Sequence, residues 1–333
     1  TAYEISLGLV GSEMCIRDRD DDEIATFYAV SLLSAARALG DSTFRLEVKA
    51  GTIALDVFNR NPNHPGAPHY AIHSFDDPIH APLALESALR YAEIAPAVSH
   101  ARHMPTHIFI QHGMWDMVSG HNQFAYDAAR ALWEEGDSVS DTVHSLDWGQ
   151  YGDLQRGDYE KARLWIERLE MVTEESGGQN RASNSLPLLR ARYVVETENW
   201  ETLEITEDSA STELLATGLS AVKTGDLETA KKAAEALKEA EGANNQVMHK
   251  EVAASILAAR GETDEAIALM DEAVEITLGM RPPNGAANPV KPTFELYGCL
   301  LYTSDAAAER SSVDLGGRSI IKKKRGGGGG GGG

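Results

Sequence analysis

The sequence predicts an all-α protein, built as a helical-repeat solenoid of antiparallel helix pairs. Apolar residues recur at spacings of three and four along most of the chain, and no stretch shows the strict alternation that is typical of a strand. Several turns also share one phrase, in which a glycine, an acidic residue and a large residue are followed three positions later by alanine. A phrase that recurs between helices indicates repeated helix pairs rather than a single bundle.

The first part of the chain is expected to consist of short helices separated by turns. In order, we expect a helix from Ile24 that ends at Gly40, a helix over 43–58, a turn over 61–66, a short helix over 69–75, a helix over 83–94 and a helix over 100–112. Pro105 interrupts the last of these, because proline removes a backbone donor and clashes with the preceding turn. A kink or break is therefore predicted there.

The second part of the chain carries the recurring phrase. It reads G-D-Y-E-K-A at 157–162, G-D-L-E-T-A at 225–230 and G-E-T-D-E-A at 261–266, with weaker copies from Gly113 and Asn199. These segments resemble the tetratricopeptide repeat, in which two helices turn at such a glycine. The resemblance implies hairpins in which small residues face each other, Gly218 opposite Ala230 and Ala254 opposite Ala266.

A narrower resemblance lies mainly in the first part of the chain. The segments that carry it read N-P-N-H-P-G-A-P-H-Y-A-I-H at 61–73, H-M-P-T-H-I-F at 103–109, P-V-K-P at 289–292 and E-L-Y-G at 295–298. They are similar to a family of bacterial tetratricopeptide-repeat proteins of unassigned function. The resemblance covers most of residues 20–298, and it implies a fold without implying an activity.

Both ends of the chain resemble a translated sequencing adapter. The segments L-V-G-S-E-M-C-I-R-D-R at 9–19 and C-L-L-Y-T-S-D at 299–305 are similar to translations of the two strands of one transposase adapter, and a glycine run ends the chain. We therefore expect disordered, adapter-derived residues at 1–19 and 299–333, a histidine-rich helical region at 20–136 and repeats at 137–298. The true N-terminus is expected to be missing, which leaves both the cytoplasm and the periplasm open as locations.

The composition excludes several classes of protein. The net charge is −21, from 51 acidic and 30 basic residues, and such a chain repels nucleic-acid phosphates and anionic membrane surfaces. Cys15 and Cys299 both lie in the adapter-like segments, so we expect neither a disulfide framework nor a thiol nucleophile. No apolar run approaches the ~20 residues of a membrane span. The expected partner is a basic or neutral protein or peptide.

Nine of the eleven histidines lie between His64 and His121. Two of them are spaced i, i+4 in the short helix over 69–75, and three more would share one face of the helix that Pro105 interrupts. Imidazole titrates near neutral pH and is the commonest metal ligand, so this density marks the candidate site. The candidate metal ligands are His69, His73, His100, His103 and His107.

Two interpretations of these histidines stay open. They either hold zinc or a similar divalent metal, with Asp76 or Asp77 as an oxygen ligand or as a partner that orients a ring, or they form a polar core beside turns at the prolines. No H-E-x-x-H signature supports the metal. The histidines that we interpret as surface or capping residues are His80, His112, His121, His144 and His249.

Two functions of different classes follow from the sequence. The leading hypothesis is a helical-repeat scaffold that binds a protein or peptide on its concave surface. The alternative is a metal-binding protein or metal-dependent hydrolase, in which the repeats support the histidines. No catalytic or organic-cofactor residues are assigned, because the chain has neither a G-x-S-x-G elbow nor a P-loop, and its five tryptophans are interpreted as packing residues.

Overall fold

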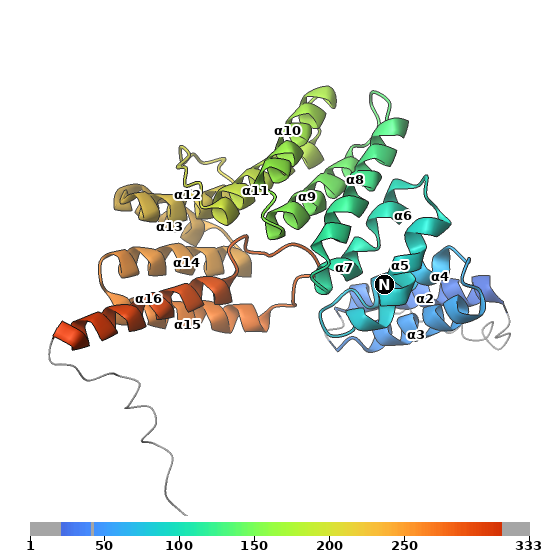
Figure 1. Cartoon of the computed structure of the whole chain (residues 1–333), viewed down its shortest axis with the longest axis horizontal. Coiled ribbons are helices and arrows are strands. Elements are labelled where there is room, and N and C mark those ends of the chain that lie inside the picture. Colours follow the sequence, from blue (N-terminus) through green and yellow to red (C-terminus); the bar gives the residue numbers. More distant parts are fainter. Residues whose placement is uncertain (1–20, 41–42, 315–333) are drawn as a thin grey trace, which may run out of the picture. The chain divides into compact units, whose positions relative to one another are not determined.

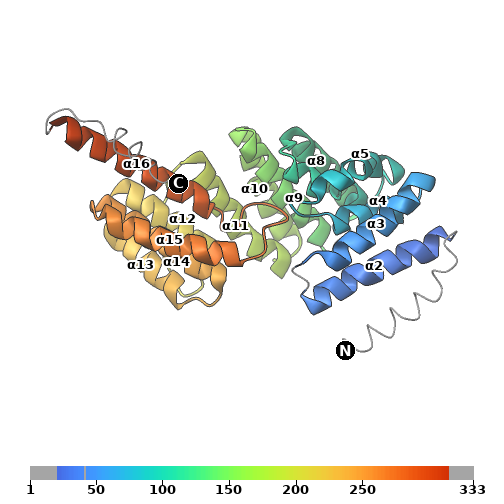
Figure 2. The same ribbon diagram turned by 90° about the horizontal axis from the view of Figure 1, so that it is seen from below.

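The computed structural model describes residues 21–40 and 43–314, with side chains up to residue 303, and these ranges are all-helical without a strand (Figures 1 and 2). The chain forms two compact units. Unit 1 comprises the chain up to Asn199 together with Arg281–Ala287, and unit 2 comprises Trp200–Met280 and the chain from Asn288 on. The predicted all-α class with paired helices is confirmed.

Unit 1 contains ten α-helices and one 3-10 helix within its described residues. They are α2 (Asp22–Leu39), α3 (Arg45–Arg60), α4 (Gly66–Ser74), η1 (Ala81–Ala84), α5 (Leu85–Ile94), α6 (Ser99–His103), α7 (Thr106–Gln111), α8 (Trp115–Leu132), α9 (Ser140–Gln155), α10 (Tyr159–Glu175) and α11 (Asn180–Thr197). Neighbours in sequence pack side by side, as α2 does with α3, α3 with α4 and α8 with α9 (Figure 1). Pro105 separates α6 from α7, as predicted.

Unit 2 contains five helices in the described chain. They are α12 (Ser211–Thr224), α13 (Leu227–Glu239), α14 (Ala243–Ala259), α15 (Thr263–Gly279) and α16 (Thr293–Asp314). Here α12 packs on α13, α14 packs on both α13 and α15, and α16 packs on α15. Among the described helices, none combines the length and apolarity that a bilayer span requires.

The recurring glycine phrase marks helix hairpins, as the repeat pattern predicts. Gly157, Gly225 and Gly261 have φ angles of +73°, +85° and +81°, a left-handed conformation that glycine adopts without a Cβ penalty. The acidic residue that follows begins the next helix: the side chains of Asp158 and Asp226 accept hydrogen bonds from backbone N–H groups three residues later. Glycine therefore ends one helix, and aspartate caps the next.

The small residues of the phrase lie in the core. Ala230 and Ala266 are 0% and 1% exposed, and Ala266 shares a core cluster with Ala254. Gly218 was predicted to face Ala230, but its near neighbours are other residues. A Cβ on Gly218 would lie 2.7 Å from Val252 and 3.2 Å from the Cβ of Ala233, one turn beyond Ala230, so Gly218 lets α12 approach both α13 and α14.

The structure places two limits differently from the expected domain ranges. The division at residue 136 falls inside unit 1, because α8 and α9 pack together across it, and the units separate at Asn199 instead. The segment expected to be disordered from residue 299 is helical as far as Asp314, and Leu300 packs on the core cluster of unit 2. The weak copy of the phrase at Asn199 forms no hairpin turn, since no helix lies between Thr197 and Ser211. Residues 1–19 and 315–333 lie outside the described residues.

The buried position of Ala266 makes the repeat register testable. Ala266→Leu should lower the free energy of unfolding by roughly 1–3 kcal/mol, because the added carbons overpack the α14–α15 contact. Chemical denaturation followed by circular dichroism measures the change. The matched control is Ala268→Leu, at an exposed position of the same helix, which should change stability little. Equal effects of the two substitutions would contradict the register.

A buried glutamate links three helices of unit 2. The Glu251 side chain on α14 is fully buried, and its Oε1 accepts a hydrogen bond of 2.8 Å from the hydroxyl of Thr293, which in turn accepts one of 3.2 Å from Thr277. Its Oε2 has no hydrogen-bond partner among the described residues. Burial raises the pKa of Glu251 from 4.5 to about 8, against the opposing effects of Thr293 and Lys291.

The raised pKa of Glu251 predicts a pH dependence of stability. The folded protein keeps the Glu251 proton up to about pH 8, whereas the unfolded protein releases it near pH 4.5. The contribution of Glu251 to the free energy of unfolding is therefore full below pH 4.5, and it is lost as the pH rises through 8. Glu251→Gln should remove this loss, which is on the order of a few kcal/mol. Urea denaturation between pH 5 and 8 measures it. With Glu265→Gln, at an exposed glutamate of α15, the decline should persist.

Candidate metal centre

Four helices of unit 1 bring six histidines together. His69 and His73 lie on α4, His100 and His103 on α6, His107 on α7 and His144 on α9. They fall into two groups in which one potential ligand atom from each residue lies within 4.8 Å of the others. The α4–α6 triad consists of His69, His73 and His100, and the α6–α9 triad consists of His103, His107 and His144.

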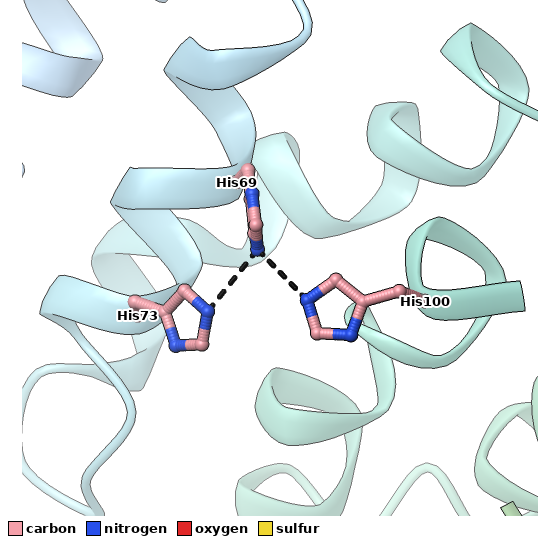
Figure 3. A group of neighbouring side chains, drawn as sticks. All are labelled: His69, His73 and His100. Atoms are coloured by element: carbon pink, nitrogen blue, oxygen red, sulfur yellow. Dashed lines mark hydrogen bonds between the residues drawn. The ribbon is translucent and has the colours of Figure 1, made fainter. Parts of the chain in front are cut away.

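In the α4–α6 triad, three ring nitrogens point toward one another (Figure 3). Nε2 of His69 lies 3.1 Å from Nε2 of His73 and 3.1 Å from Nε2 of His100. A neutral imidazole nitrogen carries either one proton or one lone pair, so that of His69 makes only one good hydrogen bond. Two nitrogens bound to one tetrahedral zinc at ~2.0–2.1 Å would lie about 3.3 Å apart. One of the two 3.1 Å contacts can thus be a hydrogen bond, and the spacing of the three nitrogens is also compatible with shared ligation.

A cavity opens beside the α4–α6 triad. His100 is the most exposed residue of this triad, and it lines a cavity of about 470 Å³ together with Val98, Leu132 and Trp133. Asp141 also lines the cavity, and its charge opposes the lowering of the His100 pKa that burial causes. Solvent and small molecules thus have access to the His100 side of the triad.

In the α6–α9 triad, hydrogen bonds at Nδ1 fix two of the rings. His107 Nδ1 lies 2.7 Å from Oδ2 of Asp76, and His103 Nδ1 lies 2.7 Å from Oδ1 of Asn122. The Asn122 amide nitrogen donates to the carbonyl of Val118, which identifies its Oδ1 as the acceptor. Both histidines therefore donate from Nδ1, and in a neutral ring this leaves a lone pair on Nε2.

If both rings are neutral, two lone pairs face each other inside the protein. The Nε2 atoms of His103 and His107 are 3.1 Å apart, and the residues are only 2% and 9% exposed. Two acceptors at this distance repel each other unless a proton or a metal ion lies between them. The ring of the third member, His144, is centred 4.2 Å from that of His103. Two of the three rings thus present Nε2 toward the centre of the triad while a partner accepts at Nδ1, as outer-shell partners do for histidines that bind metals.

Burial keeps most of these rings neutral. Desolvation, with repulsion from neighbouring rings, lowers the pKa of His69 to about 4, that of His73 to about 3 and that of His144 to about 4. The same causes hold the pKa of His103 well below its usual range. Neutral imidazole is the form that ligates metals, so these four rings are in the ligating form at neutral pH.

Asp76 and Trp148 support the α6–α9 triad from outside. The Asp76 side chain is 7% exposed, and its Oδ2 also accepts a 3.0 Å hydrogen bond from Asn284, while its buried Oδ1 has no partner among the described residues. The Trp148 ring packs on those of His103 and His107, with centroids 5.0 and 4.4 Å away. Gly285 approaches Trp148 so closely that a Cβ there would lie 2.9 Å from the indole.

All five sequence-predicted ligands lie in one of the two triads, and their metal binding stays a prediction. Asp76 contacts the His107 ring, which is one of the two roles left open for it. The interpretation of His144 as a surface or capping residue is wrong, because α9 carries it into the α6–α9 triad. No local pattern marks His144, since its contacts with α6 and α7 arise from tertiary packing. The polar-core interpretation describes His64, whose Nδ1 accepts hydrogen bonds from the backbone of Gly66 and Ala67.

The remaining histidines behave as capping or packing residues. His112, His121 and His249 each place Nδ1 within 3.2 Å of a backbone carbonyl, and His80 lies 2.9 Å from the carboxylate of Asp77. Asp77 therefore orients His80 rather than a residue of either triad. None of these four belongs to a metal-ligand group found among the described residues.

Comparison with known proteins gives a distant structural likeness only. No protein family matches the sequence, and no curated protein matches it. Among solved structures, a monomeric mutant of IFIT1 with Gppp-AAAA aligns with a TM-score of 0.44 and 11% sequence identity. The alignment covers 80% of this chain and 63% of that one, so this chain spans less than two thirds of its length.

The hydrogen bonds at Nδ1 predict the tautomers of two rings. In metal-free protein at about pH 8, both His103 and His107 should carry their proton on Nδ1, because Asn122 and Asp76 accept there. Two-bond ¹H–¹⁵N correlation spectra distinguish protonated from unprotonated ring nitrogens. A protonated Nε2 on either ring would show that the two nitrogens share a hydrogen bond instead. His249, which lies in unit 2, serves as the reference ring.

Proposed function

We propose that this protein binds a transition-metal ion through the histidines of unit 1. The observation that carries the proposal is the 3.1 Å approach of two buried Nε2 atoms, those of His103 and His107, whose Nδ1 atoms are both held by acceptors. A metal cation between them replaces repulsion with coordination. His144 supplies a third nitrogen, and three protein ligands leave a coordination position for water or a substrate.

The donor set favours zinc, copper, iron or nickel over magnesium and calcium. Each triad offers only imidazole nitrogen, which suits Zn, Cu, Fe and Ni, whereas Mg and Ca prefer oxygen. The Asp76 carboxylate hydrogen-bonds to His107 Nδ1, an arrangement that fixes the ring and raises its basicity as a ligand. The cavity at His100 adds a route for small molecules, which favours a reactive centre over a purely structural ion.

This proposal reverses the order of the two functions that the sequence suggests. Protein or peptide binding by a helical-repeat scaffold stays a prediction, which rests on the repeat fold and on the net charge of −21. The convergence of six imidazoles in unit 1 is a specific chemical feature that such a scaffold does not require. We therefore place the metal first and the scaffold role second.

Removing a ligand or its supporting carboxylate should weaken metal binding. We expect His103→Ala to lose zinc binding at its triad, and Asp76→Asn to lower the affinity by roughly 10–100-fold, the usual cost of losing an outer-shell partner. Zinc should raise the melting temperature of the parent, by the equivalent of about 2.7 kcal/mol at a hundredfold excess over Kd. Isothermal titration calorimetry with Zn²⁺ and thermal melts measure both effects.

His249→Ala provides the control, since it removes a half-buried histidine of unit 2. Its zinc affinity should equal that of the parent. If the parent binds no zinc or copper and the substitutions lower stability equally with and without added metal, then the histidines form a polar core and the proposal fails.

A further inference from the structure

The two triads form one continuous cluster of rings. Within the triads, ring centroids lie 4.2–6.4 Å apart. Between the triads, the rings of His73 and His107 have centroids 6.2 Å apart, which is inside the same range. The separation of these two rings is therefore no wider than the largest spacing within each triad.

Helix α6 contributes to both triads. His100 belongs to the α4–α6 triad and His103 to the α6–α9 triad, and residues at i, i+3 on a helix have Cβ atoms about 5–6 Å apart. A five-residue helix thus holds one ligand for each triad at adjacent positions on its surface. The juxtaposition of His73 with His107, from α4 and α7, joins the triads a second time.

We infer that the two triads form a single binuclear metal centre, in which three imidazole nitrogens hold each ion and one small oxygen ligand bridges the pair. The inference rests on the proposed function and extends it from one ion to two. Two-metal sites place their ions ~3.5–4 Å apart, and a bridging hydroxide or similar ligand can occupy the open positions of both. Two three-nitrogen sites that share a ring boundary are suited to this arrangement.

The charges around the cluster suit two divalent cations. The imidazoles are neutral donors, so the positive charge of the ions must be balanced from outside the ligand set. Asp76 lies against His107 with one unpartnered oxygen, and the charges of Asp141 and Asp147 act on His100 and His144. Asp147 already pairs with Arg192 at 2.8 Å, so Asp76 and Asp141 are the carboxylates that remain for this balance. The positive charges of Arg37 and Arg181 also act on His73 and His144.

The number of bound copper ions and their magnetic coupling distinguish a binuclear centre from a site that binds a single ion. Purified full-length chain, stripped with a chelator, is loaded with Cu²⁺ and analysed for bound copper and for its electron paramagnetic resonance intensity. We expect two copper ions per chain and a signal far weaker than that of two isolated ions, because bridged ions couple magnetically. His144→Ala should bind one copper ion and show the full signal of one, since only the α4–α6 triad remains complete.

The matched substitution is His73→Ala, which breaks the α4–α6 triad and should leave one ion in the α6–α9 triad. His249→Ala should keep two coupled ions. One ion per chain in the parent, or two ions with a full, uncoupled signal, would overturn the binuclear centre while leaving metal binding intact. No bound copper or zinc would refute the proposed function as well. The measurement on the parent decides the question even if a variant fails to fold.

Discussion

The candidate site depends on one buried carboxylate. Asp76 follows α4, and its side chain is almost fully removed from water, where an unpaired charge would cost several kcal/mol. His107 on α7 and Asn284 on the segment after α15 donate to the same oxygen. This contact fixes the tautomer of His107 and holds α7 against the end of α4. The facing nitrogens of the α6–α9 triad follow from it, because a ring held at Nδ1 presents Nε2 on its opposite side.

Helical periodicity and turn chemistry were enough to predict the architecture. The phrase that begins at Gly157 encodes both the end of one helix and the cap of the next, so a local pattern predicts a tertiary hairpin. The weak copy at Asn199 shows the limit of this reasoning, because a loop replaces the turn there. The boundary between the units was not predictable from local patterns. It depends on which helices pack together, and α8 and α9 pack across the division expected at residue 136.

The sequence predicted the site only where the candidate ligands lie close together along the chain. His69 and His73 share a helix face by their spacing alone, and the break at Pro105 is visible in the sequence. Which ring meets which depends on the packing of α4, α6, α7 and α9, so the separation into two triads and the participation of His144 needed the structure. Asn122 was not anticipated either, because a lone asparagine on an amphipathic helix gives no signal of its role.

The cluster also conflicts with ordinary core packing. Six imidazoles and a carboxylate share the interior and rim of unit 1 with other buried polar residues such as Asn122 and Asp153, although desolvation of polar groups opposes folding. Departures from ordinary core packing are concentrated at functional sites, where they lower the stability of the fold. Trp148 shows how apolar packing and polar contacts coexist here. Its ring packs on His103 and His107, while both histidines keep their hydrogen bonds at Nδ1.

Part of the site lies in the segment Arg281–Ala287, which is synthesised late. It belongs to unit 1 but follows α15, so helices α12 to α15 are translated before Asn284 emerges to donate to Asp76 and before Gly285 covers Trp148. A nascent chain that has just completed α11 holds all six histidines, yet it lacks this hydrogen bond and this cover. The residues that make these two contacts are therefore synthesised after α12 to α15, and a chain that ends within unit 2 lacks both contacts.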